Sequence, residues 1–368
     1  MDTRQMVPFE MVDDFMTASF IKLGVPEQEA KICSDVLLES DRRGIESHGC
    51  NRFKTIYIDR ILSGIQQPIT EFEIIKETKT TAVVDGHDGM GMIIAYKSMQ
   101  MAIEKAKEYG MGMVATRNST HYGIAGYYAS MATRENMIGI TGTNARPSIA
   151  PTFGVENMLG TNPLTIGLPT DEDFPFMLDC ATSITQRGKI EYYARIGKDT
   201  PKGMVIGEDG SALTDSKQIL IDLTNDDAAL APLGGIGEEL AGYKGYGYAT
   251  VVEILSAALQ AGSYLKMLTG LDKLGEKIPY HLGHFFIAID TNAFLGADSF
   301  KTIAGNILRE LRASKLAPGE KRIYTAGEKE YLCWLERKEK GIPLGTSVQK
   351  DFINVRNMLN LSHRFPFE

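Results

Sequence analysis

The first stretch of the sequence that could do chemistry is Ser47-His48-Gly49, which is followed by Arg52. A guanidinium can bind a carboxylate through two parallel hydrogen bonds, and a histidine beside it can move a proton near neutral pH. Residues four apart share a face if one helix includes both, so His48 and Arg52 would then point the same way. A helix cap with a surface salt bridge explains this stretch equally well.

The second such stretch is residues 116–163, which contain His121. The pattern predicts a strand, a polar turn with His121, a helix over 123–135, a strand over 137–141 and then a long loop rich in proline and glycine. Side chains at strand ends often form ligand sites in α/β proteins. A histidine that only caps the following helix is the alternative interpretation.

Two further features could complete a site. Asp179 ends a predicted strand and could hold a histidine in one tautomer, although a helix-capping cluster is as common. The residues after it are small or carry hydroxyls: Cys180, Ala181, Thr182 and Ser183. Lys244 lies in the glycine-rich segment 242–247 before a predicted helix, which suits a phosphate, with a flexible loop as the alternative.

The composition indicates an ordinary globular protein. Hydrophobic residues make up 43% of the 368 residues and charged residues 23%, and the length allows two domains or one domain with an insertion. The net charge of −8 comes without a basic block, which argues against nucleic acid and anionic membranes as partners. No apolar run approaches the ~20 residues of a membrane helix.

The amino terminus lacks the basic-then-apolar order of a signal peptide. The four cysteines show no C-x-x-C spacing, so neither a disulfide framework nor a metal site is indicated. We therefore expect a cytoplasmic protein with reduced thiols.

An ordinary dinucleotide-binding fingerprint is missing. Residues 110–115 match its alanine-ended form, but a helix precedes them and a strand follows, whereas the fingerprint needs the reverse order. Gly89-x-Gly91 has a better context, yet Ile94 stands where the third glycine belongs. The sequence therefore predicts no ordinary Rossmann domain.

Helices are expected at both ends of the chain, with an α/β block between them. Residues 197–237 are expected to be irregular, and a long helix is expected over 248–268. Each helical end is too small to bury a core alone, so the two should pack together. This predicts a helical domain of residues 1–76, completed by 297–368, and an α/β domain of residues 77–296.

In combination, the motifs resemble those of the type 2 malate/L-lactate dehydrogenases, a family unrelated in fold to the ordinary lactate and malate dehydrogenases. The family includes ureidoglycolate dehydrogenase, sulfolactate dehydrogenase and 2,3-diketogulonate reductase. The matching motifs follow the family order and cover nearly the whole chain: S-H-G-x-x-R at 47–52, R-N-S-T-H-Y-G-x-A-G-Y-Y at 117–128, N-A-R-P-x-x-A-P at 144–151, G-T-N-P at 160–163, L-D-x-A-T-S at 178–183, Y-K-G-Y-G at 243–247, G-H-F-F-I-A-I-D at 283–290, P-G-E at 318–320 and G-I-P-L at 341–344.

The resemblance implies a homodimeric oxidoreductase with an atypical, non-Rossmann nicotinamide-binding α/β fold and an active site near the subunit contact. It implies NAD as cofactor, with NADP possible, and a small 2-hydroxy acid as substrate, malate first. L-Lactate, ureidoglycolate, sulfolactate and 2,3-diketogulonate are alternative substrates. A non-catalytic dinucleotide or metabolite sensor is an alternative of another class, and the retained catalytic set argues against it.

Carried over by position, His48 would be the proton donor with Asp179 as its orienting partner, and His121 would be the competing donor. Arg52 would hold the substrate carboxylate, and Ser47 and Tyr57 would also contact substrate. Arg146 is predicted to be the second cation that a buried dicarboxylate requires. The residues expected to line the cofactor are Asn144, Ala145, Asp179, Cys180, Ala181, Thr182, Ser183, Lys244, Pro318, Gly319 and Glu320.

Overall fold

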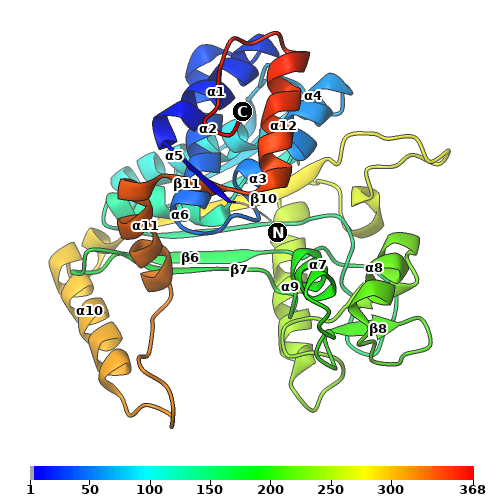
Figure 1. Cartoon of the computed structure of the whole chain (residues 1–368). Helices are drawn as coiled ribbons and strands as arrows, with labels where there is room; N and C mark the ends of the chain where they lie inside the picture. Colours follow the sequence, from blue (N-terminus) through cyan, green and yellow to red (C-terminus); the bar gives the residue numbers. More distant parts are fainter. Residues whose placement is uncertain (1–3) are drawn as a thin grey trace.

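The computed structural model describes residues 4–368 and is built around a seven-stranded sheet (Figure 1). Only the β3–β4 pair is parallel, and the other neighbouring pairs within this sheet are antiparallel. The chain is therefore a mixed α/β protein, as the sequence predicts. The strands, in spatial order, are β2 (Glu73–Glu77), β3 (Thr81–Asp85), β4 (Met111–Ser119), β10 (Leu282–Asp290), β5 (Met137–Thr143), β6 (Leu164–Leu168) and β7 (Phe176–Cys180).

Strands β3, β4 and β5 run in the same direction, so their carboxyl ends lie at the same edge of the sheet. Helix α5 (Gly91–Tyr109) connects β3 to β4, and helix α6 (Ala125–Arg134) connects β4 to β5. Strand β10 lies between β4 and β5 and is antiparallel to both, so these two run in the same direction. Their carboxyl ends therefore meet at one edge, where His121 follows β4 and Asn144 follows β5.

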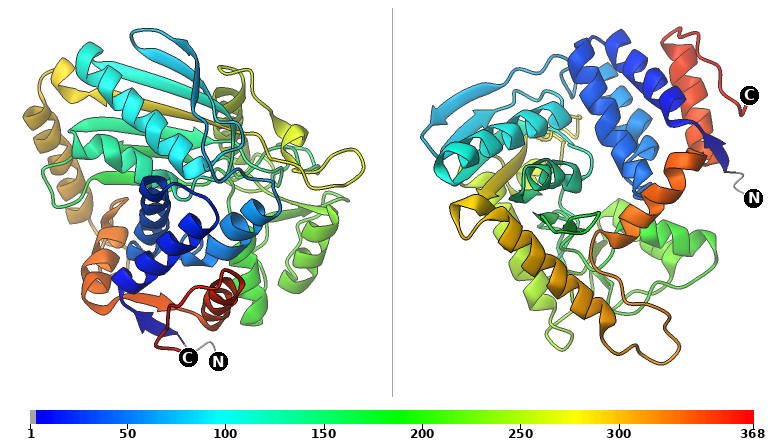
Figure 2. Two further views of the ribbon diagram at one scale, coloured as in Figure 1. Left: turned by 90° about the horizontal axis from the view of Figure 1, so that it is seen from above. Right: turned by 90° about the vertical axis from the view of Figure 1, so that its left-hand side faces the viewer.

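Helices cover the two faces of the sheet differently. The right-hand view of Figure 2 shows α5 and α6 on one face, and α9 (Gly242–Ala257) and α10 (Ala297–Ala313) on the other. Helix α6 packs close to the sheet because β5 offers no side chain at Gly139. A Cβ there would lie 2.6 Å from the backbone oxygen of Ala129. The α6 face is thus closely packed, whereas the other face is partly open.

A layer of helices from both chain ends lies above α5 and α6 (Figure 1). Phe352 of the carboxyl-terminal part packs on Phe15 and Phe53, with ring centroids 5.0 and 5.7 Å apart. The layer also includes the strand pair β1 (Gln5–Val7) and β11 (Ile342–Leu344). Its helices are α1 (Phe9–Lys22), α2 (Glu27–Arg42), α3 (Cys50–Arg52), the π-helix η1 (Phe53–Ile58), α4 (Asp59–Leu62), α11 (Glu328–Lys340) and α12 (Thr346–Met358).

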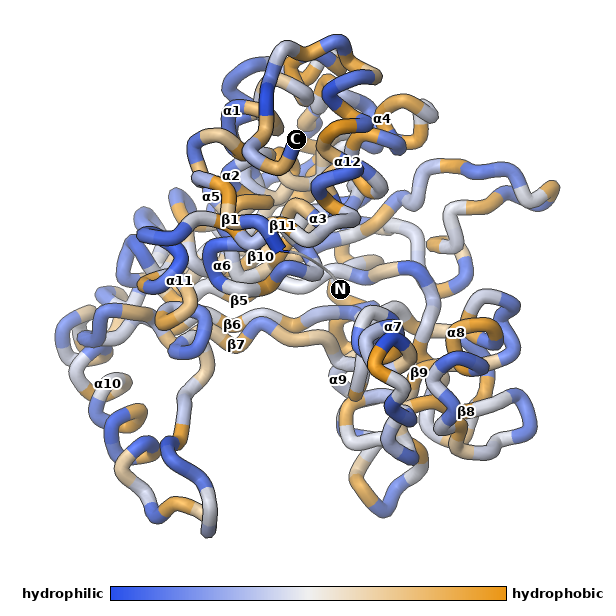
Figure 3. The backbone as a smooth tube through the Cα atoms, in the orientation of Figure 1, coloured by the Kyte–Doolittle hydropathy of each residue, from blue (hydrophilic) through white to orange (hydrophobic). Residues whose placement is uncertain are grey.

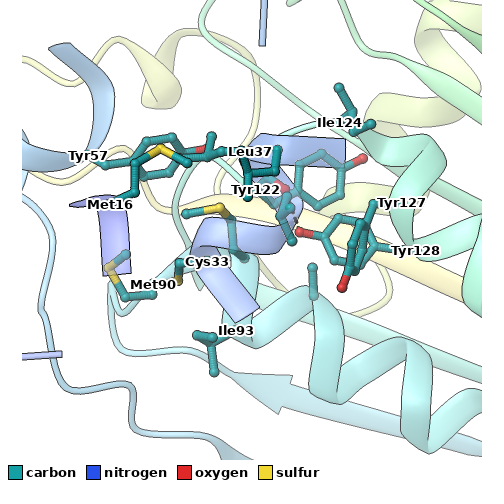
Figure 4. Packing of buried hydrophobic residues seen from close by; sticks show 14 of the residues in the cluster. Met16, Cys33, Leu37, Tyr57, Met90, Ile93, Tyr122, Ile124, Tyr127 and Tyr128 are labelled. Carbon is teal, nitrogen blue, oxygen red and sulfur yellow. Dashed lines mark hydrogen bonds between the residues drawn. The ribbon is translucent and has the colours of Figure 1, made fainter. Parts of the chain in front are cut away.

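One hydrophobic cluster joins this helical layer to the sheet (Figure 4). It runs from Phe15 in α1 through Tyr57 and Tyr128 to Phe286 in β10. Helix α10, by contrast, lies along the far face of the sheet, and its Arg309 pairs with Asp171. The division into residues 77–296 and two helical ends stays a prediction.

The expectation of an irregular segment over 197–237 was wrong. This segment contains β8 (Val205–Gly207), α8 (Ser216–Asn225) and β9 (Ala228–Leu230), and α7 (Arg187–Arg195) precedes it. The strands have only three residues each, too few for an alternating pattern to be visible. The α8 helix has a clear start, because the Asp215 side chain accepts hydrogen bonds from the backbone N–H groups of Lys217 and Gln218.

The helix predicted over 248–268 is also shifted. The observed helix α9 begins at Gly242 and ends at Ala257, so the glycine-rich segment forms its first turns. Gly242 and Gly245 allow these turns to pack on the segment before them, because a Cβ would lie 1.9 and 2.2 Å from backbone oxygens. Ala261, with φ +51°, belongs to the bend beyond the helix. A 3-10 helix follows at η2 (Leu265–Leu268), and another, η3 (Thr291–Ala293), follows β10.

Within residues 4–368, no helix is both long and apolar enough to cross a lipid bilayer.

Candidate active site

His121 lies in the turn after β4 and is held through one ring nitrogen. Its Nδ1 is 2.7 Å from the Tyr57 hydroxyl and accepts a hydrogen bond from the backbone N–H of Gly123 at 3.3 Å. A backbone N–H can only donate, so Nδ1 must be unprotonated in this arrangement. The neutral ring therefore carries its hydrogen on Nε2, which makes Nε2 a hydrogen-bond donor.

Tyr57 reaches His121 from a π-helix, which the sequence did not predict. Residues Phe53–Ile58 form this π-helix between the short helices α3 and α4. A π-helix winds more widely than an α-helix, and single turns of it are frequent at functional sites. The Tyr57 ring is fully buried and lies near Met16 and Leu37 (Figure 4). Tyr57 therefore forms a hydrogen bond with a histidine, and its expected contact with substrate stays a prediction.

His48 lies beside His121, with the two rings nearly parallel and their centroids 5.9 Å apart. Its Nδ1 is 2.8 Å from the Ser47 hydroxyl, and Arg52 donates from Nε to the Ser47 backbone oxygen at 2.7 Å. Its other nitrogen, Nε2, has no hydrogen-bond partner among residues 4–368. Ser47 therefore links the ring of His48 to the guanidinium of Arg52.

His48 and Arg52 do not share a helix, contrary to the conditional expectation. Helix α3 begins only at Cys50, whose N–H donates to the buried carboxylate of Asp41 at 2.7 Å. Gly49 packs against the same carboxylate, since a Cβ there would lie 2.2 Å from its oxygen. His48 therefore precedes helix α3. Arg52 lies at the end of this helix and is linked to His48 through Ser47.

Both histidines are neutral at pH 7 in the free protein. Burial, and then the charge of Arg52, lowers the pKa of His48 to about 4. The pKa of His121 lies well below its usual range, because of burial first and then the charges of His48, Arg60 and Arg52. Their environment is therefore positive and partly dry, which favours a bound anion.

Arg60 belongs to this group, although sequence analysis did not single it out. Its guanidinium lies over the ring of Tyr280, with the charged carbon 4.4 Å from the ring centroid. The available signal was its position three residues after Tyr57, which places both on one helical face. Tyr280 is 220 residues away in the sequence and gave no signal.

The residues around His48 line a cavity of about 290 Å³. This cavity brings His48 and Ser47 together with three residues that were expected to line the cofactor, Asp179, Cys180 and Ala181. Its walls also include Tyr122, Gly123, Thr161, Pro163, Gln186 and Glu330. Two motifs that are 131 residues apart in the sequence therefore line one cavity.

Asp179 does not orient His48 by a hydrogen bond, contrary to the expectation. Its two carboxylate oxygens accept from the backbone N–H of Gly126 at 2.7 Å and from the Thr165 hydroxyl at 2.8 Å. Burial raises the pKa of this carboxyl group. No hydrogen bond among residues 4–368 joins it to either histidine. The hydrogen-bond partner of His48 Nδ1 is instead the hydroxyl of Ser47.

Three other residues predicted to line the cofactor have buried polar side chains, and these differ in whether a hydrogen-bonding group remains without a partner. Asn144 is fully buried, and its amide bonds the backbone of Ser263 and Gly283, so it ties segments together. The Thr182 hydroxyl donates to backbone oxygens of the 161–162 segment. Ser183 alone of the three has a buried hydroxyl without a partner among the described residues.

The remaining predicted residues are not among those that line the His48 cavity. Lys244 is exposed in the first turn of α9, and Pro318, Gly319 and Glu320 are exposed in the loop between α10 and α11 (Figure 1). Ala145 packs through its backbone on Gly160, where a Cβ would lie 2.4 Å from the Ala145 oxygen.

Arg146 does not line the His48 cavity either. It is exposed and lines a different cavity, of about 470 Å³, together with Asn157, Arg187 and Asp226. The expectation that Arg146 supplies a second cation next to His48 therefore finds no support in the geometry of this chain.

Comparison with known proteins matches the chain to one family. The profile described as malate/L-lactate dehydrogenase covers residues 7–352. Malate dehydrogenase of Pyrococcus horikoshii is 42% identical over 345 residues, which are 94% of this chain and 93% of that protein. L-sulfolactate dehydrogenase of Methanocaldococcus jannaschii is 37% identical over 343 residues, 93% of each chain.

The solved structures agree with the sequence comparison. The crystal structure of malate dehydrogenase from Entamoeba histolytica superposes with a TM-score of 0.93 at 43% identity, covering 98% of this chain and 99% of that one. The structure of malate dehydrogenase from Pyrococcus horikoshii gives a TM-score of 0.87 at 38% identity, covering 98% and 97%. The chain belongs to the malate/L-lactate dehydrogenase family.

Proposed function

We propose that the protein interconverts a small 2-hydroxy acid and its 2-keto acid with a nicotinamide cofactor, and that malate and oxaloacetate are the preferred pair. The observation that carries this proposal is the pair of parallel histidines, His48 and His121, beside two arginines, Arg52 and Arg60. Neither arginine forms an ion pair within residues 4–368. Two relatives are named for malate and L-sulfolactate. Each of these acids carries a second anionic group.

The ring nitrogens suggest different roles for the two histidines. His48 has Nε2 free and lines the cavity, so it would take the hydroxyl proton of the substrate and return it in the reverse reaction. His121 donates from Nε2 and would hydrogen-bond the oxygen on C2, polarising the carbonyl. Arg52 keeps its terminal nitrogens free for the carboxylate on C1. When bound, the nicotinamide supplies or accepts the hydride at C2.

Several residues fit a nicotinamide cofactor. The buried hydroxyl of Ser183 lacks a partner among the described residues, next to Asp179–Ala181 in the wall of the His48 cavity. Lys244 lies in the first turn of the 16-residue helix α9, where backbone N–H groups and a cation favour phosphate. The strand order, with β10 inserted antiparallel, supports a nicotinamide-binding fold other than the Rossmann fold. NAD is the proposed cofactor, with NADP as the alternative.

An absorbance assay of the reduced nicotinamide tests the proposal. Oxaloacetate, pyruvate, glyoxylate-type keto acids and sulfopyruvate would each be added with NADH and then with NADPH. Rapid loss of absorbance with oxaloacetate supports the proposal, and preference for another keto acid changes only the substrate. Cofactor binding without turnover of any of them would instead favour the sensor.

The low pKa of His48 predicts the pH dependence of both directions. Malate oxidation needs a neutral His48, which is already present well above pH 4, so kcat/KM for malate should show no histidine inflection between about pH 5.5 and 7.5. Oxaloacetate reduction needs the protonated ring, so its kcat/KM should fall about tenfold per pH unit over the same range. An inflection near pH 6.5 in both profiles would contradict this assignment.

We further propose that the protein is a homodimer, and the open face of the sheet supports this. Helix α10 exposes a stripe at helical spacing, with Ile303 58%, Ile307 55% and Leu311 53% exposed. The groove between α10 and the sheet is apolar and has a volume of about 690 Å³. Hydrophobic residues also recur along α9, β6 and β7 (Figure 3). Contiguous exposed apolar residues that border a groove often mark a protein–protein contact.

Replacing Ile307 with glutamate should shift the protein toward monomer in analytical ultracentrifugation, because a buried unpaired charge in the contact is costly. Glu310→Gln, an exposed position on the same helix, is the matched control. A wild-type protein that sediments as a monomer would exclude the dimer. The assignment to the cytoplasm stays a prediction.

A further inference from the structure

Arg60 is a half-buried cation without an acidic partner. Its side chain makes no ion pair or hydrogen bond among residues 4–368, and burial lowers the pKa of its guanidinium. Most arginines in comparable surroundings are paired here, as Arg42 is with Asp35 at 2.7 Å. Burying an unpaired charge costs free energy. An anion from outside the chain would remove that cost.

Tyr280 provides an aromatic ring against which the Arg60 guanidinium packs. The guanidinium lies over the Tyr280 ring at 4.4 Å from its centroid. The same ring packs on Gly270, where an added Cβ would lie 2.5 Å from a ring carbon. An aromatic ring occupies a face of a guanidinium and leaves its N–H edge available for two hydrogen bonds. Arg60 is therefore oriented for an anion but holds none of its own.

Arg60 lies in the same electrostatic environment as the proposed reaction site. It lowers the pKa of His121 more than Arg52 does, and the two arginines also act on each other. Tyr57, three residues before Arg60, donates its hydroxyl hydrogen to Nδ1 of His121 at 2.7 Å. The site thus presents two separate cations, Arg52 and Arg60, around a pair of neutral histidines.

We propose that Arg60 binds the second anionic group of the substrate, the distal carboxylate or sulfonate, while Arg52 binds the carboxylate next to C2. This inference rests on the proposed function. Two cations balance the two charges of a dianion, whereas a monocarboxylate would leave Arg60 unpaired. Arg60 takes the part that sequence analysis gave to Arg146, which lines another cavity.

The test compares kcat/KM for oxaloacetate and pyruvate in Arg60→Gln, Arg60→Lys and the rival Arg146→Ala. Arg60→Gln should lower the oxaloacetate-to-pyruvate preference by about 10- to 100-fold and leave pyruvate within a few-fold of wild type. Arg60→Lys should retain part of the preference, because it keeps the charge without the two-pronged fork. If Arg146→Ala removes the preference and Arg60→Gln does not, the proposal is wrong.

A binding measurement separates this inference from the proposed function. Calorimetry with malate and lactate in the presence of reduced cofactor cannot turn over, so it reads recognition alone. Malate affinity should fall at least about tenfold in Arg60→Gln, with lactate unchanged. If malate affinity falls in this way but the enzyme reduces no keto acid, Arg60 would still bind the second anionic group, whereas the proposed dehydrogenase function would be wrong. Equal affinity of the wild type for malate and lactate would overturn the inference.

Two further variants guard against a folding defect. Arg42→Gln removes another half-buried arginine that lies over an aromatic ring, Phe9 at 5.5 Å, and should leave substrate preference unchanged. Tyr280→Leu keeps Arg60 but removes its orienting ring, and should lower the preference for oxaloacetate several-fold. Thermal melting of each variant shows whether it is folded. If Tyr280→Leu and Arg60→Gln are both folded and keep the wild-type preference for oxaloacetate over pyruvate, the proposal is contradicted.

Discussion

His48→Asn is expected to lower kcat in both directions by about 10²- to 10⁴-fold, which is the range for loss of a general acid–base group. Asparagine can still reach the hydroxyl of Ser47, so the local backbone should keep its shape. The asparagine amide does not titrate near neutral pH, so it cannot act as a general acid or base. Cofactor affinity should therefore stay close to that of the wild type.

The other histidine should respond differently. His121→Asn retains an N–H group that can reach the C2 oxygen, so its effect should fall mostly on KM. His363→Asn is the control, because His363 bonds Asp14 in the helical layer. Single-turnover kinetics with each keto acid separate the chemical step from product release. A large loss of kcat in His121→Asn, with His48→Asn nearly normal, would exchange the two roles.

Arg52→Lys is expected to lower kcat/KM for the keto acid about 10- to 100-fold, corresponding to about 1.5–3 kcal/mol for a hydrogen bond to a charged group. Arg52 uses Nε on the backbone oxygen of Ser47, which leaves its terminal nitrogens for substrate. A lysine has one nitrogen and cannot serve both partners. Removing the contact to Ser47 should also loosen the orientation of His48.

The measurement pairs steady-state kinetics with cofactor titration by fluorescence. The affinity for reduced cofactor should be unchanged in Arg52→Lys, while the loss appears in kcat/KM for every keto acid tested. A loss confined to oxaloacetate would assign Arg52 to the distal group and exchange it with Arg60. Near-normal kcat/KM in a folded variant would show that Arg52 is not the carboxylate anchor.

Local patterns were sufficient to place much of the site. The apolar runs before His121 and Asn144 predicted the strands, and parallel strands β4 and β5 bring their ends together. Gly126 lies in the first turn of the helix after His121 and leaves room for close packing, because a Cβ there would lie 2.8 Å from a carboxylate oxygen of Asp179. The structure shows the carboxylate of Asp179 there, accepting the Gly126 N–H at 2.7 Å.

Contacts between distant segments could not be predicted from one sequence. The Arg60–Tyr280 contact depends on where a long loop before β10 returns to the sheet, and no local pattern encodes that return. Tyr57 reaches His121 from a π-helix, whose hydrogen bonds span one more residue than those of an α-helix. The spacing of apolar residues over such a short segment does not distinguish the two helix types. Asp179 was expected to orient His48 because a carboxylate can hold a histidine in one tautomer. Its oxygens instead accept from the Gly126 N–H and the Thr165 hydroxyl.

The proposed reaction transfers a hydride directly to C2 of a 2-keto acid. The most direct test uses NADH carrying deuterium at C4 on one face of the ring, with oxaloacetate, and examines the product by mass spectrometry and NMR. We predict malate with a single deuterium at C2 from one of the two stereoisomers of the labelled cofactor, and unlabelled malate from the other. Malate that carries no deuterium at C2 from either isomer, or no malate at all while the cofactor binds, would contradict the account.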